Sequence, residues 1–153
     1  MIVAISYWDD LSLSSETTLT KAREGAAQAA EGALVTESYE VAVAERPVVP
    51  DPGATVQMTR VQLDPLRVDA GLAFVRDELL QRLSACSGLC SAELLIDRVI
   101  GNGLLVTTWT DQAAAGRAQA ILDGLSGDAE AVAGAKFPRS ESYMLVWRSA
   151  PAG

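Results

Sequence analysis

The 153-residue sequence contains no histidine. Histidine is the side chain that most often titrates near neutral pH, and it is the commonest protein ligand of metals and of haem iron. Its absence excludes Ser-His-Asp and Cys-His catalysis, as well as zinc or iron sites built with histidine. Any proton transfer would fall to Asp, Glu, Tyr, Lys or Cys. We expect neither a metal site nor a cofactor.

Cysteine is scarce as well. Cys86 and Cys90 are the only two, and the three residues between them differ from the Cys-x-x-Cys spacing of redox motifs. Two thiols are also too few for a structural zinc site within one chain. A disulfide or a reactive thiol stays open as an alternative, although free cysteine is more commonly a small buried apolar side chain.

The sequence also lacks long apolar runs and an excess of positive charge. No run approaches the ~20 residues that a membrane-spanning helix needs, and the first residues lack the basic and apolar segments of a secretory signal. We therefore expect a cytoplasmic protein with no membrane contact. The formal net charge is −8 and the basic residues are scattered. Because nucleic acids are bound by basic surfaces, we expect no nucleic-acid partner.

The sequence does contain one pattern that occurs twice. Residues 3–9 and 105–111 are each an apolar run that closes on Trp and Asp. Each run is followed by an Ala-rich and Gly-rich stretch, and then by Glu-Ser-Tyr at residues 37–39 and 141–143. The repetition predicts that one strand–helix–strand unit has been used twice.

Hydrophobic periodicity and turn residues predict the remaining elements. Pro47, Pro50 and Pro52 keep one segment extended, so a Pro-rich linker separates a short first block from a longer second one. In the second block a Gly101–Gly103 turn joins two strands as a hairpin. The expected strands are 2–8, 35–45, 55–63, 92–100, 104–110 and 140–148, and the expected helices are 17–31, 66–85 and 112–125.

This order predicts an α+β fold with ferredoxin-like antiparallel sheets. The order βαββαβ gives a four-stranded sheet with two helices on one face. We expect residues 1–46 to be a partial ferredoxin-like half (βαβ), 47–54 the Pro-rich linker, 55–148 a complete ferredoxin-like unit and 149–153 a tail.

The second block resembles the dimeric α/β-barrel superfamily, and in particular its antibiotic-biosynthesis monooxygenases. The resemblance rests on the order of three motifs: a strand that runs into Asp64-Pro65 and a long helix, a Gly88 before an apolar strand, and a strand that ends at Trp109 before Asp111 and an Ala-containing helix. In that family two ferredoxin-like sheets face each other and close a barrel, commonly as a homodimer. The resemblance implies a fused relative with a shortened first half, which pairs with a second chain.

The haem-degrading branch of the family fits this sequence poorly. The resemblance leads one to expect a histidine and a tryptophan on the second helix and an asparagine on the first strand. The sequence has no histidine, residues 112–125 contain no tryptophan, and Thr59 stands at the place of the asparagine. We therefore do not expect haem degradation.

What the resemblance implies is a cofactor-independent monooxygenase that binds a small aromatic or polyketide-type molecule in the barrel. The candidate substrate-binding residues are Trp109, Tyr143, Thr59 and Gln57, whereas no catalytic residue is assigned. Strand-end tryptophan and strand tyrosine are also common packing residues. The alternative is a non-enzymatic dimeric barrel protein with a stress-related or assembly role. A filled interior without a cavity near ~300 Å³ would favour that alternative.

Overall fold

The computed structural model describes residues 3, 5, 7 and 37–146. The chain divides into two compact units, residues 1–38 and residues 39–153. The expected helix over 17–31, the tail over 149–153 and most of the expected strand over 2–8 lie outside the described residues. All described helices and strands belong to the second unit.

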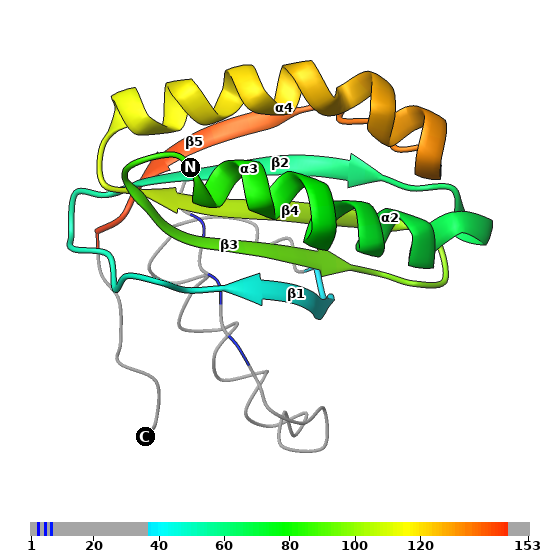
Figure 1. The fold of residues 1–153 in the computed structure, drawn as a ribbon. Coiled ribbons are helices and arrows are strands. Elements are labelled where there is room, and N and C mark those ends of the chain that lie inside the picture. Colours follow the sequence, from blue (N-terminus) through cyan, green and yellow to red (C-terminus); the bar gives the residue numbers. More distant parts are fainter. Residues whose placement is uncertain (1–2, 4, 6, 8–36, 147–153) are drawn as a thin grey trace, which may run out of the picture. The chain divides into compact units, whose positions relative to one another are not determined.

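The second unit is built on one antiparallel sheet of five strands in the order β1-β3-β4-β2-β5 (Figure 1). Without β1, the order of the other four is that of a ferredoxin-like sheet, and the expected α+β fold is confirmed. The strands are β1 (Glu40–Glu45), β2 (Thr55–Gln62), β3 (Leu89–Ile96), β4 (Asn102–Trp109) and β5 (Ser140–Met144).

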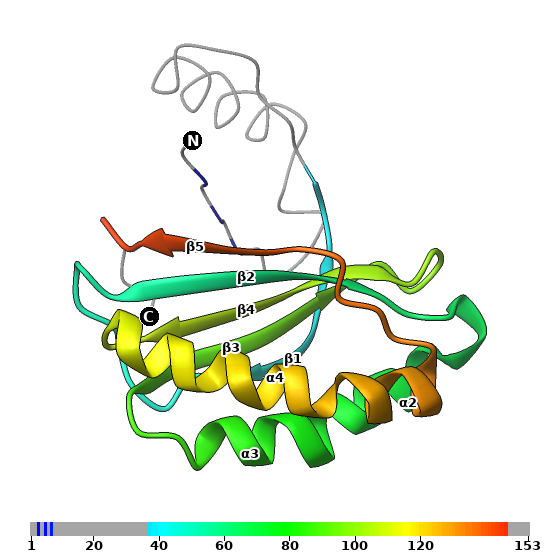
Figure 2. The ribbon, with the colours of Figure 1, turned by 90° about the horizontal axis from the view of Figure 1, so that it is seen from above.

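Two helical segments lie side by side in one layer and cover the same face of this sheet (Figure 2). The first is a continuous helical segment between β2 and β3, and it fills the range expected for one helix over 66–85. It contains a 3₁₀ turn (Pro65–Arg67), α2 (Val68–Phe74), a π turn (Val75–Leu79) and α3 (Leu80–Ser84). The second segment is α4 (Gln112–Ala133). Among the described residues, no helix is long and apolar enough to cross a membrane.

Strand β1 differs from its expected place. The sequence assigns it to the first block, but in the structure it pairs antiparallel with β3 and forms one edge of the five-stranded sheet. The guanidinium of Arg98 holds β1 in place by donating to both carboxylate oxygens of Glu40, at 2.8 and 3.1 Å. A four-stranded ferredoxin-like sheet would leave the backbone groups at the outer edge of β3 without partners, and β1 satisfies them. The Pro-rich segment therefore connects two strands of one sheet.

Helix α4 is longer than expected. The predicted helix ended near residue 125 because Gly124 and Gly127 flank that point. The observed helix continues to Ala133 and ends at Gly134, whose φ is 61°. Both internal glycines lie on the exposed side, where they interrupt no packing. The helix continues past both glycines because packing of its apolar face against the core outweighs the low helix propensity of glycine. Its buried residues are Ala114, Ala115, Ala118, Leu122, Leu125, Ala129 and Ala133.

The expected hairpin is also shifted. Strand β3 runs from Leu89 to Ile96 rather than from 92 to 100, because Asp97 ends it by accepting hydrogen bonds from the backbone N–H groups of Val99 and Ile100. Gly101 closes the turn with a φ of 79°, and a Cβ at this position would lie 2.3 Å from the carbonyl oxygen of Leu63. Only glycine fits there.

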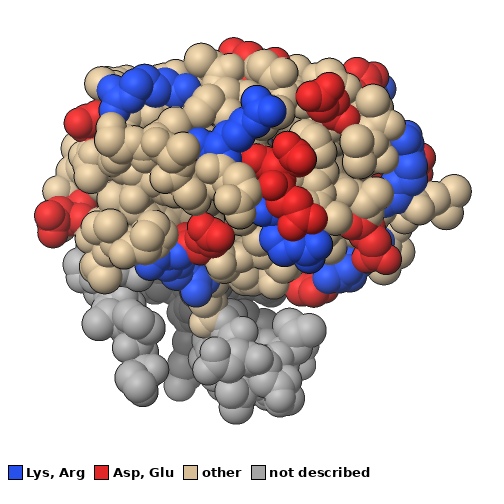
Figure 3. Space-filling model, viewed as in Figure 1, with Lys and Arg blue, Asp and Glu red and all other residues tan. Residues whose placement is uncertain are grey.

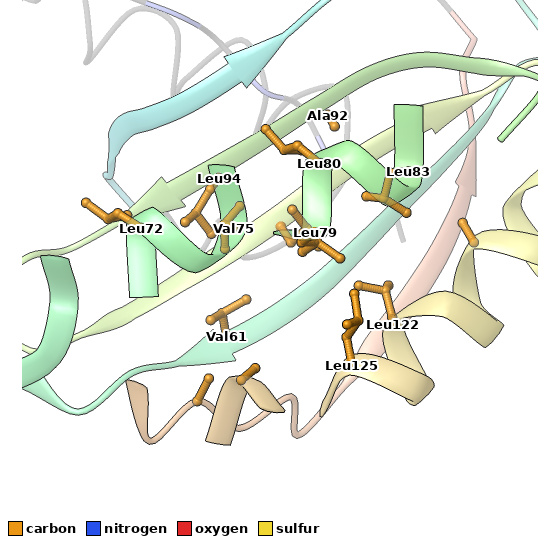
Figure 4. Packing of buried hydrophobic residues seen from close by; sticks show 14 of the residues in the cluster. Val61, Leu72, Val75, Leu79, Leu80, Leu83, Ala92, Leu94, Leu122 and Leu125 are labelled. Carbon is orange, nitrogen blue, oxygen red and sulfur yellow. The ribbon is translucent and has the colours of Figure 1, made fainter. Parts of the chain in front are cut away.

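The main core lies between the helices α2, α3 and α4 and the strands β2, β3 and β4 (Figure 4). Leu83, Ala92 and Ile96 are completely buried in it. Both cysteines are free thiols; Cys90 is buried, and burial raises the pKa of its thiol. The cysteines therefore form no disulfide in this structure, and Cys90 fits the role of a small buried side chain.

Candidate functional site: a groove between α4 and β5

A groove of about 410 Å³ lies between α4 and the strands β2 and β5, of which β5 is the edge strand. We call it the α4–β5 groove. It opens on the side of the sheet that the helices cover, not on the opposite face where a barrel interior would lie. Its lining residues are Thr59, Gln119, Leu122, Asp123, Ser126, Gly127, Glu130, Ala135, Lys136, Phe137 and Ser140.

The sheet becomes polar towards this groove. By strand alternation Gln57 and Thr59 share the helix-covered face with Val61, which belongs to the core. Gln57 is paired with Thr107 of β4 and Ser142 of β5. The floor of the groove is formed by the hydroxyl groups of Thr59 and Ser140, with the amide of Gln57 beside it, whereas the same face at β3 is apolar.

A hydrogen-bond network joins α4 to this floor. Gln57 Nε2 donates to Gln119 Oε1 at 3.2 Å, and Gln119 Nε2 donates to Asp123 Oδ1 at 2.9 Å. Beside it, the hydroxyls of Thr59 and Ser140 lie 3.0 Å apart and share one hydrogen bond. These contacts fix the orientation of the polar groups before any ligand enters, which lowers the cost of binding.

The remaining walls combine apolar and charged side chains. Leu122, Ala135 and Phe137 supply an apolar surface, and the carboxylates of Asp123 and Glu130 and the ammonium of Lys136 lie around it. Ligand sites of proteins typically pair an apolar wall with a few oriented polar groups. The groove can therefore hold a flat ring against the apolar wall while a polar substituent meets the floor.

The predicted site residues do not all meet at this groove. Thr59 lines it, and Gln57 lies next to it through its bond to Gln119. Trp109 is on the same face of the sheet but fully buried, and its indole Nε1 donates to Thr107 Oγ1 at 2.9 Å. It packs in the core and does not line the groove.

Tyr143 lies on the opposite face of the sheet. It is paired with Val56, and its hydroxyl donates a hydrogen bond to the carboxylate of Glu141. This bond raises the pKa of Tyr143 above its ordinary value of 10, so the phenol stays protonated at neutral pH and is a poor base. On the same face of the sheet as Tyr143, the guanidinium of Arg60 donates a hydrogen bond to the Tyr39 hydroxyl at 3.4 Å.

The helix side of the groove was missed by sequence reasoning. Gln119, Asp123, Ser126 and Glu130 follow one another at intervals of four, three and four residues. That spacing places the four side chains on one side of a helix. It would have predicted the helix side of the groove if the predicted helix had extended past Gly127. The premature end at residue 125 concealed it.

Two site classes find no support among the described residues. No group of three or more Cys, Asp or Glu side chains there could hold a metal ion. Basic and acidic side chains are interspersed on the face shown in Figure 3, without a continuous basic surface.

The Trp-Asp pattern that occurs twice has a structural explanation in its second copy. Asp111 is the N-cap of α4, and its carboxylate accepts a hydrogen bond from the backbone N–H of Ala114 at 2.8 Å. N-cap aspartate satisfies one of the free N–H groups of a first helical turn. The first copy lies mostly outside the described residues.

Comparison with known proteins adds distant relatives. No protein-family profile matches the sequence. Two uncharacterised proteins of Mycobacterium tuberculosis are similar: Rv2557 is 28% identical over 109 residues, covering 70% of this chain and 49% of its own length, and Rv2558 is 29% identical over 97 residues, covering 62% and 41%. The chain thus spans about half the length of the curated relatives that it matches.

Solved structures show the same fold at low sequence identity. A candidate monooxygenase from Fusobacterium nucleatum superposes with a TM-score of 0.58 at 12% identity, over 89% of this chain and 64% of that one. The haem-degrading enzyme from Listeria monocytogenes gives 0.52 at 13% identity, over 70% of each chain. MupZ from Pseudomonas fluorescens gives 0.51 at 14%, over 61% and 70%.

Proposed function

We propose that this chain, which has the ferredoxin-like fold of the monooxygenase-like α/β-barrel proteins, binds a small aromatic molecule in the α4–β5 groove. The observation that carries the proposal is the groove itself. Its volume of about 410 Å³ exceeds the ~300 Å³ of the smallest ordinary ligand sites, and its polar floor faces an apolar wall. The shared fold supports this class of function, and the network through Gln57 supports its location.

The chemistry we propose is cofactor-independent oxygenation. In that reaction an ionised aromatic substrate itself reduces dioxygen: a ring CH₂ becomes C=O, and the second oxygen atom leaves as water. The chain has to hold the substrate away from water and receive its proton. Leu122 and Phe137 can exclude water from one ring face, and the carboxylates of Asp123 and Glu130 are the proton acceptors that line the groove.

A pair of glycine substitutions on α4 tests the binding site. Gly127 lines the groove and Gly116 does not, and at both positions an added Cβ meets no atom within 4 Å. We expect wild type to bind 1-naphthol in a calorimetric titration. Gly127→Trp should weaken that affinity at least tenfold because the indole occupies the groove, whereas Gly116→Trp should leave it unchanged. Absence of binding to wild type, or equal affinity in both variants, would contradict the proposal.

Oxygen consumption tests the chemistry separately. Wild type is incubated with anthrone under oxygen, and the rate is compared with that of buffer alone. We expect a protein-dependent rate that Gly127→Trp removes and Tyr143→Phe retains, since Tyr143 lies on the opposite face of the sheet. A rate equal to that of buffer would rule out oxygenation of this substrate class while leaving the binding site intact.

A second candidate function is favoured by the sheet face that points away from the helices. Leu95, Leu104 and Val106 form a separate apolar cluster there, packed with side chains that include Met58. Val41 is paired with Leu95 on the same face and remains 41% exposed. The three clustered side chains are themselves buried, so Val41 and the edge of the sheet around it are the apolar surface that a second copy of the chain could cover, in a role of assembly rather than catalysis.

Light scattering after gel filtration tests this candidate. We expect wild type to elute as a dimer and Val41→Lys as a monomer, because a charge at that position opposes burial against a second sheet. Val48→Lys is the matched control, since Val48 is also exposed but lies on the connection between β1 and β2. A monomeric wild type would remove the candidate.

A further inference from the structure

We propose that Gln57 is a hydrogen-bond acceptor that selects groove ligands carrying a donor group, and that Asp123 sets its orientation through Gln119. The proposal rests on the ligand site described above and names the chemical class of its ligand: an uncharged aromatic with a hydroxyl or amine. Three observations lead to it.

The first observation is an acceptor without a partner. Gln57 is only 7% exposed, and among the described residues its Oε1 atom has no hydrogen-bond partner. Buried polar atoms are nearly always hydrogen-bonded, so such an atom needs an explanation. A donor from outside the chain would supply the bond that the protein leaves unmade.

The second observation fixes which end of the Gln57 amide is left over. The carboxylate of Asp123 accepts hydrogen bonds, so Gln119 must turn its NH₂ group towards it, as the 2.9 Å contact shows. The Oε1 atom of Gln119 then points towards Gln57, and the NH₂ group of Gln57 donates a hydrogen bond to it at 3.2 Å. The oxygen of Gln57 is therefore the free end, and the assignment follows from a carboxylate that can only accept.

The third observation is the position of this relay. Gln119 and Asp123 both line the α4–β5 groove, and so does Thr59, which lies two residues along the strand on the same face as Gln57. Gln57 itself is not a lining residue; it lies one hydrogen bond behind Gln119, so the donor group of a ligand has to extend past the lining to reach its Oε1 atom. The groove is lined by two carboxylates, of Asp123 and Glu130, and by one ammonium, of Lys136, so its net charge is negative and favours entry of the ligand in its neutral form, with its proton still in place. A neutral donor is the chemistry that satisfies Gln57 without opposing these charges.

The experiment compares two ligands that differ only in a donor. The affinities of 1-naphthol and 1-methoxynaphthalene are measured by calorimetry for wild type, Gln57→Met, Asp123→Asn and Glu130→Gln. Wild type should prefer 1-naphthol at least about tenfold, because a ligand without a donor leaves the buried acceptor unpaired. Gln57→Met, which keeps the volume but removes the acceptor, should bind both ligands equally.

Asp123→Asn gives the sharpest readout. The new amide can donate to Gln119 Oε1, which turns both glutamine amides over and leaves the NH₂ group of Gln57 as the free end. The preference for 1-naphthol should disappear or reverse, while total affinity for 1-methoxynaphthalene rises. Glu130→Gln removes the same charge from the groove without touching the relay, so its preference should equal that of wild type.

Failure of this inference is distinguishable from failure of the binding site. If wild type binds both ligands equally and Gly127→Trp abolishes both, the groove binds aromatics but Gln57 does not select them. A preference for 1-naphthol that survives in both Gln57→Met and Asp123→Asn would also overturn the inference. If neither ligand binds any form of the protein, the ligand site itself is refuted.

Discussion

The helix-covered face of the sheet is packed in two different ways on its two sides. Over β3 and β4 the side chains are mostly Ala, Leu and Ile together with the buried Trp109, and the buried sides of α2, α3 and α4 pack against them. Over β2 and β5 the same face carries Gln57, Thr59 and Ser140, and α4 leaves a groove above them. One side therefore has the composition of a core, and the other has that of a binding site.

We interpret this difference as a separation between the residues that stabilise the fold and those of the proposed ligand site. An apolar side chain buried on the β3 side loses its contacts with several elements when it is shortened. On the β5 side the polar groups are partly satisfied by one another and partly left for a ligand. Substitutions on the β3 side should therefore change the free energy of unfolding, whereas substitutions on the β5 side should change the affinity for a ligand.

The largest effect is expected for Leu83→Ala. Leu83 is 0% exposed in the core under α3. Its truncation should lower the free energy of unfolding by about 3 kcal/mol, from lost burial and the cavity left behind. Urea denaturation measures this, and 1-naphthol affinity should be unchanged in the folded protein. Thr59→Val on the groove side is the counterpart and should cost under about 1 kcal/mol. Equal losses from the two substitutions would erase the contrast between the sides.

A smaller loss is expected for Trp109→Phe. The change removes the indole hydrogen bond to Thr107 and part of a fully buried ring. We expect a loss of about 2 kcal/mol in urea denaturation, with ligand affinity kept. A variant with unchanged stability and weakened 1-naphthol binding would instead place Trp109 in the ligand site.

Asp111→Ala should cost about 1 kcal/mol, because it removes the N-cap of α4. Thermal unfolding followed by circular dichroism is a suitable measurement, and Asp111→Ser should restore most of the loss because serine also caps. If serine fails to restore the stability, the role of Asp111 in the repeated pattern is not capping.

Gly124→Ala should stabilise the protein by about 0.5–1 kcal/mol. Gly124 lies inside α4 and is exposed, and an added Cβ meets no atom within 4 Å. Alanine there reduces the conformational entropy of the unfolded chain at no steric cost. Urea denaturation should show the gain, and a destabilised variant would mean that this side of α4 is covered in the protein studied.

The smallest effect concerns Tyr143, and its dependence on pH appears only at high pH. Its hydrogen bond to Glu141 raises its pKa above 10, so the bond stabilises the folded state at pH values below 10 and is lost as the pH rises through the higher folded value. The stability difference between wild type and Tyr143→Phe should be constant near neutral pH and shrink above pH 10. A difference that grows with pH would contradict the assigned donor.

The ferredoxin-like order could be predicted from the sequence because each of its elements has a local sequence pattern. Alternation of side chains predicts β2, the apolar stripe from Leu72 to Leu83 predicts the first helical segment, and Gly88 and Gly101 predict turns. The place of β1 could not be predicted this way, since alternation identifies a strand without naming its partner. The end of α4 was misjudged because Gly124 and Gly127 weaken a helix locally, whereas tertiary packing holds it.

The candidate site was predictable only in part, for a related reason. Gln57 and Thr59 were identified on their strand, but the residues that complete the groove lie on the misjudged part of α4. Trp109 and Tyr143 were grouped with them because the resemblance marks strand ends and does not say which face of the sheet a side chain occupies. That face depends on register and on which side the helices cover, and both are properties of the folded unit.

The most direct test of the central claim is a chemical-shift map of ¹⁵N-labelled protein titrated with 1-naphthol. The account predicts that the side-chain amide signals of Gln57 and Gln119 shift first, together with backbone signals of α4 from residue 119 to 130. Signals of Tyr39, Val56 and Tyr143 should stay in place. Shifts confined to that second group would move the binding site to the opposite face of the sheet and contradict the account.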